Sequence, residues 1–176
     1  DASILDSTGV ELSLLRKEGQ YRKLHVLAHY CKAKRAVWIA KARETDRGAA
    51  DITIGLQLLS QLPPPQGGLL LADRGYDAEA LYRLAFRKGW KICMKQRKPF
   101  ESRFGLRGKV LASDSLEIYR AFRGRVESIF GGFANRYASL VRERLAPARS
   151  KASLWWCVSH NMRVLMKLRS ALCLIC

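Results

Sequence analysis

The chain has 176 residues, which is enough for one domain with a substantial core and rather short for two. Hydrophobic residues make up 48% of the sequence, a composition that excludes an intrinsically disordered protein. Lysine and arginine number 32 against 15 acidic residues, so the formal net charge is +17 and the pI is near 10.2. This surplus favours a polyanionic partner, nucleic acid first and an anionic membrane surface second, with a merely basic soluble protein as the alternative.

The sequence shows no sign of export or of a membrane span. It opens with "DASILD", which is neither a basic nor an apolar leader, and the absence of an initial Met suggests a fragment or a processed chain. The longest apolar stretch, 154–176, is interrupted by His160, Arg163, Lys167 and Arg169 and is unsuited to crossing a bilayer. The odd number of cysteines, without paired CxxC motifs, indicates reduced thiols. We therefore expect a cytoplasmic protein.

Apolar patterns predict the elements of the first half of the chain. Residues 2–5 form a short strand that ends at Asp6, in "ILDSTG". The stretches 21–31 and 36–45 suit two further strands, because they alternate or are rich in β-forming residues. Apolar positions at helical spacing predict a helix over 47–62, which "PPPQGG" terminates.

The next segment alternates strands with a helix. "GLLLA", residues 68–72, is the apolar run of a strand buried on both faces. A helix over 77–89 follows, with Asp77 as its cap and Gly89 at its end. "WKICMKQ", residues 90–96, is predicted to be the fifth strand and precedes a basic loop that contains glycine.

Two amphipathic helices complete the chain. The first begins at Ser115 and carries an apolar stripe of Tyr119, Phe122, Val126, Ile129, Phe130 and Phe133. The second, within 151–176, carries a stripe of Leu154, Val158, Met162, Leu165 and Leu172, and we expect Trp155 and Trp156 in the core. The first three strands leave no room for crossover helices and form an antiparallel meander, whereas the β-α-β unit requires parallel strands. The predicted fold is α/β, a mixed five-stranded sheet flanked by helices.

Three carboxylates stand where this fold could bring them together. Asp6 and Asp73 each end a predicted strand, and if the strands are parallel neighbours both side chains emerge at the same edge of the sheet, where ligands collect. Glu127 borders the apolar stripe of the helix that begins at Ser115, about 100° round the helix from Val126. Oxygen-rich clusters hold Mg²⁺, and two ions about 3.5–4 Å apart support phosphoryl transfer.

Each carboxylate also has a purely structural explanation. Asp6 could form an Asx turn or cap a helix. Asp73 could pair with Arg74, which follows it directly. Glu127 could form an ordinary ion pair with Arg123, four residues earlier on the same helix.

Several segments, in order, resemble the catalytic domain of DDE-type insertion-sequence transposases of bacteria and archaea. They are "ILDSTG", "YRKLHVLAHY", "T" then "D" in "ETDRGAAD", "LLLADRGYDAEALYRLAFRKG" and "RGRVESIFGGFANRY", of which "ADRGYD" with "RVESIFG" is specific. The resemblance covers nearly the whole chain. It implies an RNase H-like fold in which two aspartates and a glutamate surround two Mg²⁺ ions, with Mn²⁺ as a substitute. Carried over to this sequence, these residues are Asp6, Asp73 and Glu127, in catalytic and metal-binding roles.

Many relatives add a Tyr and an Arg before the glutamate and a Lys seven positions after it. Arg123 matches the Arg, whereas Tyr119 stands one position early and Ala134 replaces the Lys. Arg136 is the candidate to grip the terminal phosphate in its place. The family's N-terminal region, which binds the element ends, is expected to be missing, so residues 1–176 are predicted to form a single compact catalytic domain.

A basic strip surrounds the loop that follows the fifth predicted strand. It consists of Lys91, Lys95, Arg97, Lys98, Arg103, Arg107 and Lys109. Contact with DNA phosphates is the functional explanation and a solvated loop is the alternative; because the resembled family acts on DNA, we favour contact. Tyr76 could stack on a base or cap the core. His25 and His29 share one face of a strand, where a position near a basic surface is favoured over metal ligation.

The resemblance implies a DNA transposase that cuts element ends with the help of a metal and joins the freed 3′-hydroxyl to target DNA. The implied partners are DNA and a second copy of the chain in a synaptic complex, without a membrane, at the nucleoid of a prokaryotic cell. Two alternatives remain open, a catalytically inactive DNA-binding remnant and an RNase H-like nuclease that cuts without joining. The sequence has no GxxxxGK[ST] loop, so nucleotide hydrolysis is not indicated.

Overall fold

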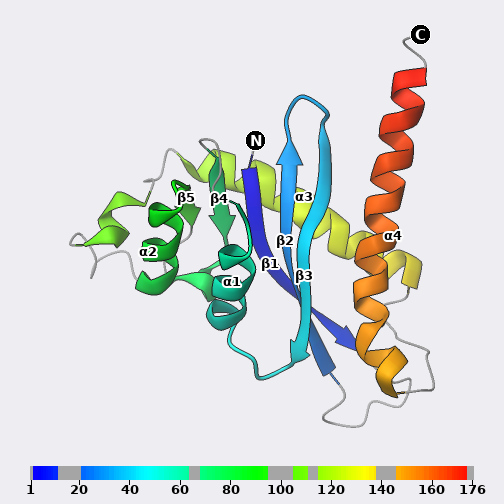
Figure 1. Ribbon diagram of the computed structural model, residues 1–176, viewed down its shortest axis with the longest axis horizontal. Coiled ribbons are helices and arrows are strands. Elements are labelled where there is room, and N and C mark those ends of the chain that lie inside the picture. Colours follow the sequence, from blue (N-terminus) through cyan, green and yellow to red (C-terminus); the bar gives the residue numbers. More distant parts are fainter. Residues whose placement is uncertain are drawn as a thin grey trace.

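A computed structural model describes residues 2–11, 21–63, 68–94, 105–110, 115–137 and 146–173. Its strands are β1 (Ala2–Glu11), β2 (Tyr21–Cys31), β3 (Ala36–Asp46), β4 (Leu69–Ala72) and β5 (Lys91–Met94). They form one sheet in the order β3-β2-β1-β4-β5 (Figure 1). β1 with β2 and β2 with β3 are antiparallel pairs, whereas β4 is parallel to both β1 and β5. The predicted mixed sheet is confirmed, and it is consistent with an RNase H-like α/β fold.

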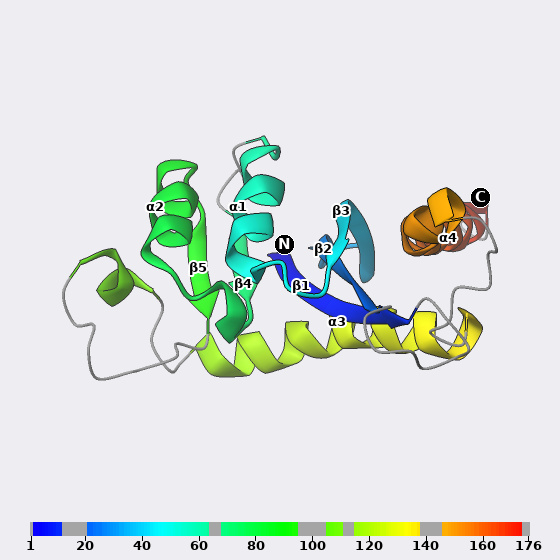
Figure 2. The ribbon, with the colours of Figure 1, turned by 90° about the horizontal axis from the view of Figure 1, so that it is seen from below.

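Helices cover both faces of this sheet. They are α1 (Asp51–Ser60), the 3₁₀ helix η1 (Arg74–Tyr76), α2 (Glu79–Arg87), the 3₁₀ helix η2 (Leu106–Lys109), α3 (Ser115–Tyr137) and α4 (Ala146–Cys173). Figure 2 shows α1 and α2 on one face, α3 across the opposite face, and α4 beside β3 at the edge. Among the described helices, none has the length and apolarity needed to cross a bilayer.

The alternation of side chains along the strands divides the interior into two cores. Leu5, Leu27 and Leu70 belong to the core under α1 and α2. Ile4, which precedes Leu5, and Leu71, which follows Leu70, belong to the core under α3. Adjacent residues therefore point to opposite faces of the sheet, and both faces are covered. This explains why β4 reads in the sequence as an uninterrupted apolar run.

β1 is longer than the sequence indicates. The strand does not end at Asp6, as predicted, but continues to Glu11. β2 offers an antiparallel partner along the whole of β1, and this long-range pairing extends the strand. β4, in contrast, stops at Ala72, which pairs with Leu5. Asp6 is therefore the first residue of β1 beyond the parallel ladder, although it lies inside the strand.

The ends of two helices also differ from the prediction. α1 begins at Asp51, four residues later than expected. The N-cap position of α2 is Ala78 and not Asp77, and the Asp77 carboxylate accepts a hydrogen bond from the Tyr82 hydroxyl. Gly89 does follow the end of α2 as predicted, with a φ of +85° that favours glycine.

The apolar stripe of α3 is confirmed. Tyr119, Val126, Ile129 and Phe133 of α3 are all buried. Of the stripe predicted for the last helix, Leu154 is partly buried against the core, Val158, Met162 and Leu165 are exposed, and the side chain of Leu172 lies outside the described residues. Over residues 151–170 of α4, where side chains are described, the buried ones are Ala152, Ser153, Trp156 and Cys157, so Trp156 lies in the core as predicted. The large apolar side chains that face solvent are Trp155, Val158, Met162, Leu165 and Met166, with Trp155 68% exposed.

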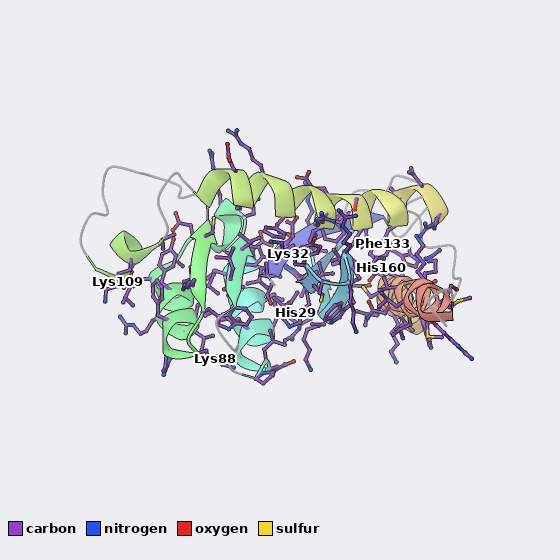
Figure 3. All side chains as sticks on the ribbon, turned by 90° about the horizontal axis from the view of Figure 1, so that it is seen from above. His29, Lys32, Lys88, Lys109, Phe133 and His160 are labelled. Atoms are coloured by element: carbon purple, nitrogen blue, oxygen red, sulfur yellow. The ribbon has the colours of Figure 1, made fainter. Side chains whose placement is uncertain are left out.

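Polar contacts to an edge strand explain the orientation of α4. The Asn161 side chain pairs with Ile39 of β3, where its Oδ1 accepts the backbone N–H and its Nδ2 donates to the backbone carbonyl, both at 2.8 Å. His160 Nε2 lies 2.9 Å from the Val37 carbonyl oxygen, and its ring meets Phe133 of α3 edge-on (Figure 3). β3 is an edge strand whose backbone groups need partners. These contacts turn the more apolar face of α4 outward.

Candidate functional site

Asp6 and Asp73 lie side by side on adjacent strands. Each is the next residue after the last parallel pair, Leu5 with Ala72. Both are half-buried, and they line one small cavity together with Tyr119 of α3. By the alternation along β1, Asp6 shares the α3 face of the sheet with Ile4. The structure thus brings the two predicted aspartates together, and their roles stay a prediction.

Short contacts orient both carboxylates. Asp6 Oδ1 accepts a hydrogen bond of 2.8 Å from the backbone N–H of the next residue, Ser7. This bond is not the Asx turn considered from the sequence, in which the carboxylate would bind the backbone N–H two residues on. Asp73 Oδ1 lies 3.4 Å from the Tyr119 hydroxyl, which donates to it. The backbone N–H of Tyr76 donates to the Asp73 carbonyl at 3.0 Å and closes the turn that follows β4.

The glutamate of the predicted trio is not brought into the same group. Glu127 is exposed on α3, next to the buried Val126, on the helix that crosses the face towards which the aspartates point. It follows Tyr119 by eight residues, which is about 12 Å along a helix axis. Within the described part of the chain, no three or more His, Cys, Asp or Glu side chains are placed to hold a metal ion together. The described part of the chain therefore places two carboxylates, those of Asp6 and Asp73, at the candidate site.

The donor atoms of this pair fit a hard divalent cation. Asp6 and Asp73 offer carboxylate oxygens, and the hydroxyl beside them belongs to Tyr119. An all-oxygen set suits Mg²⁺ or Mn²⁺ better than a metal that prefers sulfur or nitrogen. The residues present therefore fit such an ion, although two carboxylates leave most of its coordination to water or substrate.

Asp51, the first residue of α1, ends the segment "ETDRGAAD" but was given no role from the sequence, and three side chains contact its carboxylate. Its Oδ1 lies 2.7 Å from Lys23 Nζ, 3.0 Å from the Ser7 hydroxyl and 3.4 Å from His25 Nδ1. Burial by itself raises the pKa of Asp51, but the nearby His25, Lys23 and Ser7 side chains outweigh burial and hold that pKa well below its ordinary value. The carboxylate is therefore ionised at neutral pH.

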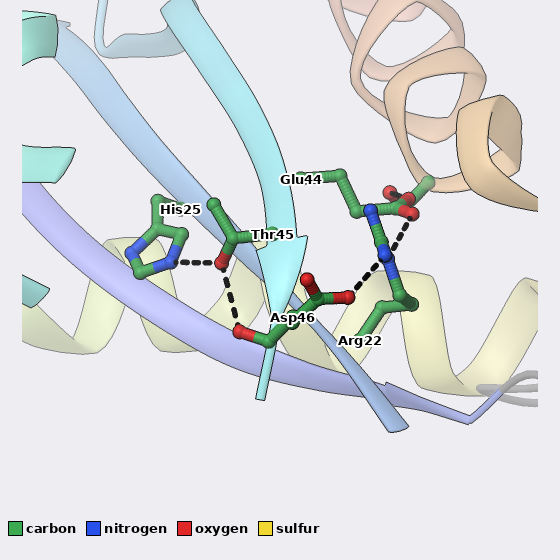
Figure 4. Close-up of polar contacts among 6 residues, drawn as sticks. Arg22, His25, Glu44, Thr45 and Asp46 are labelled. Carbon is green, nitrogen blue, oxygen red and sulfur yellow. Dashed lines mark hydrogen bonds and ion pairs between the residues drawn. The ribbon is translucent and has the colours of Figure 1, made fainter. Parts of the chain in front are cut away.

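His25 lies in the interior and not at a basic surface, which corrects the favoured interpretation. Its side chain is fully buried, and its Nε2 lies 2.9 Å from the Thr45 hydroxyl of β3 (Figure 4). Thr45 in turn donates to the Asp46 carbonyl at 3.2 Å. His29 is half-buried, with Nδ1 2.5 Å from the Ser3 hydroxyl, and burial lowers its pKa. Both histidines thus serve the packing of the sheet.

The turn after Asp73 packs directly on α1. A Cβ at Gly75 would lie 2.8 Å from Asp51 Oδ2, and a Cβ at Gly55 of α1 would lie 2.6 Å from Cδ1 of Tyr76. Both distances are too short for any larger residue without a shift. Tyr76 is 1% exposed, so of the two uses considered for it, capping the core is the correct one.

The carboxylates of the site affect the pKa of the buried Tyr76. Burial is the main cause that raises the pKa of Tyr76 far above its ordinary value, and the negative charges of Asp51, Asp6 and Asp73 raise it further. The phenol therefore stays neutral. Its hydroxyl lies near Ser7 but makes no hydrogen bond of ordinary geometry with any described residue.

Replacing Gly55 by Ala should destabilise the protein, although alanine is the better helix former. The new methyl group would meet the Tyr76 ring, and overpacking of this kind costs about 1–3 kcal/mol, against a gain in helix propensity of about 1 kcal/mol. Gly124→Ala is the matched control, because it also lies in a helix and its Cβ would meet nothing within 4 Å. Urea unfolding should show Gly55→Ala less stable than the parent and Gly124→Ala equally or more stable. Equal gains in both would contradict the packing described.

The predicted DNA-contacting residues are only partly visible. Lys91 and Lys109 are exposed, and Figure 3 places Lys109 at the far end of the molecule from His160 of α4. Arg136 is exposed near the end of α3. Lys95, Arg97, Lys98 and Arg103, and the side chains of Arg107 and Arg123, lie outside the described residues.

A family model described as "Transposase DDE domain" matches residues 1–157, which extend from β1 into α4 and include Asp6, Asp73 and Glu127. No curated protein matches the chain, and no solved structure does.

Proposed function

The chain belongs to the transposase DDE domain family, and on this premise we propose that it cuts DNA at the ends of a mobile element and joins the freed strand to target DNA. Membership makes it a nucleic-acid phosphoryl-transfer enzyme with DNA as its substrate, in a family that generally uses divalent metals. The observation that carries the proposal is the shared cavity of Asp6 and Asp73 at the end of the parallel ladder.

We propose that Asp6 and Asp73 hold Mg²⁺, with Mn²⁺ as a substitute. When bound, such an ion neutralises phosphate charge and activates a nucleophile at neutral pH. The protein holds the carboxylates ready, because the Ser7 amide orients Asp6 and the Tyr119 hydroxyl orients Asp73. Glu127 is proposed to complete the site and orient the attacking hydroxyl when DNA binds.

The excess of positive charge supports the binding of a long polyanion. We propose that phosphates are contacted by Arg123, Arg136, Lys95, Arg97, Lys98, Arg103, Arg107 and Lys109. Each such contact releases counterions from DNA, so binding should weaken as salt concentration rises. We further propose that two copies of the chain act together in a synaptic complex, at the nucleoid.

Metal-dependent cutting is the experiment that tests this function. We expect the protein to nick and cleave duplexes that carry the ends of its own element when Mg²⁺ or Mn²⁺ is present, and to stop when EDTA is added. Sequencing of the products should show element strands joined to target DNA. Joining separates a transposase from a nuclease that only cuts.

A catalytically inactive remnant is the second candidate. Two observations favour it, the Ala134 that stands where relatives have Lys and the placement of Glu127 outside the aspartate pair. It predicts salt-sensitive binding to DNA that is independent of metal, with no strand cut at any concentration of Mg²⁺ or Mn²⁺. That result would overturn the proposed function.

A further inference from the structure

We propose that Asp51 is a positioning residue, which fixes the placement of Asp6 relative to Asp73 from the opposite face of the sheet. The inference builds on the proposed function, because it takes those two aspartates to be the metal-holding pair. Asp51 belongs to α1, which packs on one face of the sheet. Asp6 and Asp73 line a cavity with Tyr119 of α3, which lies on the other face. Asp51 is thus placed to act on the pair through the strands that carry it.

One oxygen of Asp51 is connected to Asp6 through a single residue. Ser7 donates its backbone N–H to Asp6 Oδ1 at 2.8 Å and its hydroxyl to Asp51 Oδ1 at 3.0 Å. The Ser7 hydroxyl lies on the α1 face of the sheet and the Asp6 carboxylate on the α3 face, because neighbouring side chains of a strand point to opposite faces. The position of Ser7, and with it the carboxylate of Asp6, is therefore held by Asp51.

The other oxygen of Asp51 sets the turn that carries Asp73. A Cβ at Gly75 would lie 2.8 Å from Asp51 Oδ2 and 3.3 Å from its Cγ, so the backbone of the turn rests against this carboxylate. The same turn is closed by the hydrogen bond of 3.0 Å from the Tyr76 N–H to the Asp73 carbonyl. Contact at Gly75 is consequently transmitted to Asp73 over two residues.

The carboxylate of Asp51 is itself fixed by β2. Lys23 Nζ and His25 Nδ1 lie 2.7 Å and 3.4 Å from its Oδ1. His25 cannot turn away easily, because it is fully buried and its other ring nitrogen lies 2.9 Å from the Thr45 hydroxyl. A charged group held from two strands is a stiffer support than a lone surface carboxylate, whose ion pairs contribute little.

Asp51→Asn tests this role, because asparagine keeps the shape and one acceptor oxygen but loses the charge. The variant should bind Mn²⁺ about 10–100-fold more weakly, the usual loss when a supporting partner of a metal ligand is removed. Circular dichroism and DNA affinity should match the parent protein. Cleavage should recover when Mn²⁺ is raised, since the ligands themselves remain. Free Mn²⁺ measured by electron paramagnetic resonance gives the binding constant independently of activity.

Two further variants make the outcome decisive. Ser7→Ala removes the bridging hydroxyl and should also weaken Mn²⁺ binding, which keeps the test open if Asp51→Asn does not fold. Asp46→Asn is the charge-matched control, because Asp46 has an 88% exposed side chain that pairs with Arg22, and it should bind Mn²⁺ like the parent.

Asp6→Asn separates failure of this inference from failure of the proposed function. If Asp6→Asn loses Mn²⁺ binding while Asp51→Asn and Ser7→Ala retain it in full, Asp51 has no positioning role and the metal pair stands. If Asp6→Asn binds Mn²⁺ like the parent, the metal pair itself is wrong. A loss confined to thermal stability in Asp51→Asn, with unchanged Mn²⁺ affinity, would also overturn the positioning role.

Discussion

Replacing Asp73 by Asn is expected to abolish DNA cleavage and to leave DNA affinity unchanged or raised. The substitution removes one charged oxygen ligand from the cavity shared with Asp6, and loss of one group that stabilises charge in the reaction lowers the rate by about 10²–10³-fold. It also removes a negative charge that would repel the phosphates. Single-turnover cleavage and fluorescence anisotropy at matched salt measure the two effects separately.

Asp77→Asn is the control for this result, because Asp77 follows Asp73 in the same short turn but binds the Tyr82 hydroxyl. It lies outside the cavity of the aspartate pair, so it should cleave at nearly the parent rate. Retained cleavage in Asp73→Asn would remove Asp73 from the catalytic site. Equal loss in both variants would mean that the turn is damaged, and not that a metal ligand is missing.

Tyr76→Ala and Tyr76→Phe should differ sharply in stability. Truncation to alanine leaves a cavity between α1 and the turn, and the loss for a buried aromatic is about 3–5 kcal/mol, a large part of a typical domain stability. Phenylalanine keeps the ring and removes a buried hydroxyl that makes no ordinary hydrogen bond to the described residues, so its stability should be nearly unchanged. Denaturant unfolding of both variants gives the comparison.

The same pair of variants reports on the site. Tyr76→Ala should also lose cleavage, because the turn that carries Asp73 loses its support on Gly55, whereas Tyr76→Phe should cleave like the parent. If Tyr76→Phe loses several kcal/mol of stability, the hydroxyl has a bonding role that the packing alone does not provide.

The sheet could be predicted from the sequence because its signals are local. Connection lengths separated antiparallel from parallel strands, and the continuous apolar run before Asp73 indicated a strand buried on both faces. The end of β1 could not be predicted, because its continuation past Asp6 depends on pairing with β2. The prediction of the buried face of α4 was wrong for a similar reason. Asn161 and His160 bind an edge strand more than 120 residues away in the sequence.

Only part of the candidate site could be predicted from the sequence. Asp6 and Asp73 could be predicted to lie together because each directly follows a predicted strand, and the two strands are parallel neighbours. Asp51 was missed because its importance lies in contacts from Ser7, Lys23 and the turn at Gly75, none of which is close to it in the sequence. For Glu127, helical periodicity predicts a side of α3 but says nothing about how far along the sheet that part of the helix lies.

The exposed apolar side chains of α4 and the high net charge respond differently to salt. Copies that each carry a net charge of +17 repel one another, and this repulsion fades as ions shorten the Debye length. Attraction between exposed apolar surfaces such as Trp155, Met162 and Leu165 does not fade in this way. DNA binding loses strength over the same range. We therefore expect rising ionic strength to weaken contact with DNA while it also lowers the repulsion between copies of the chain.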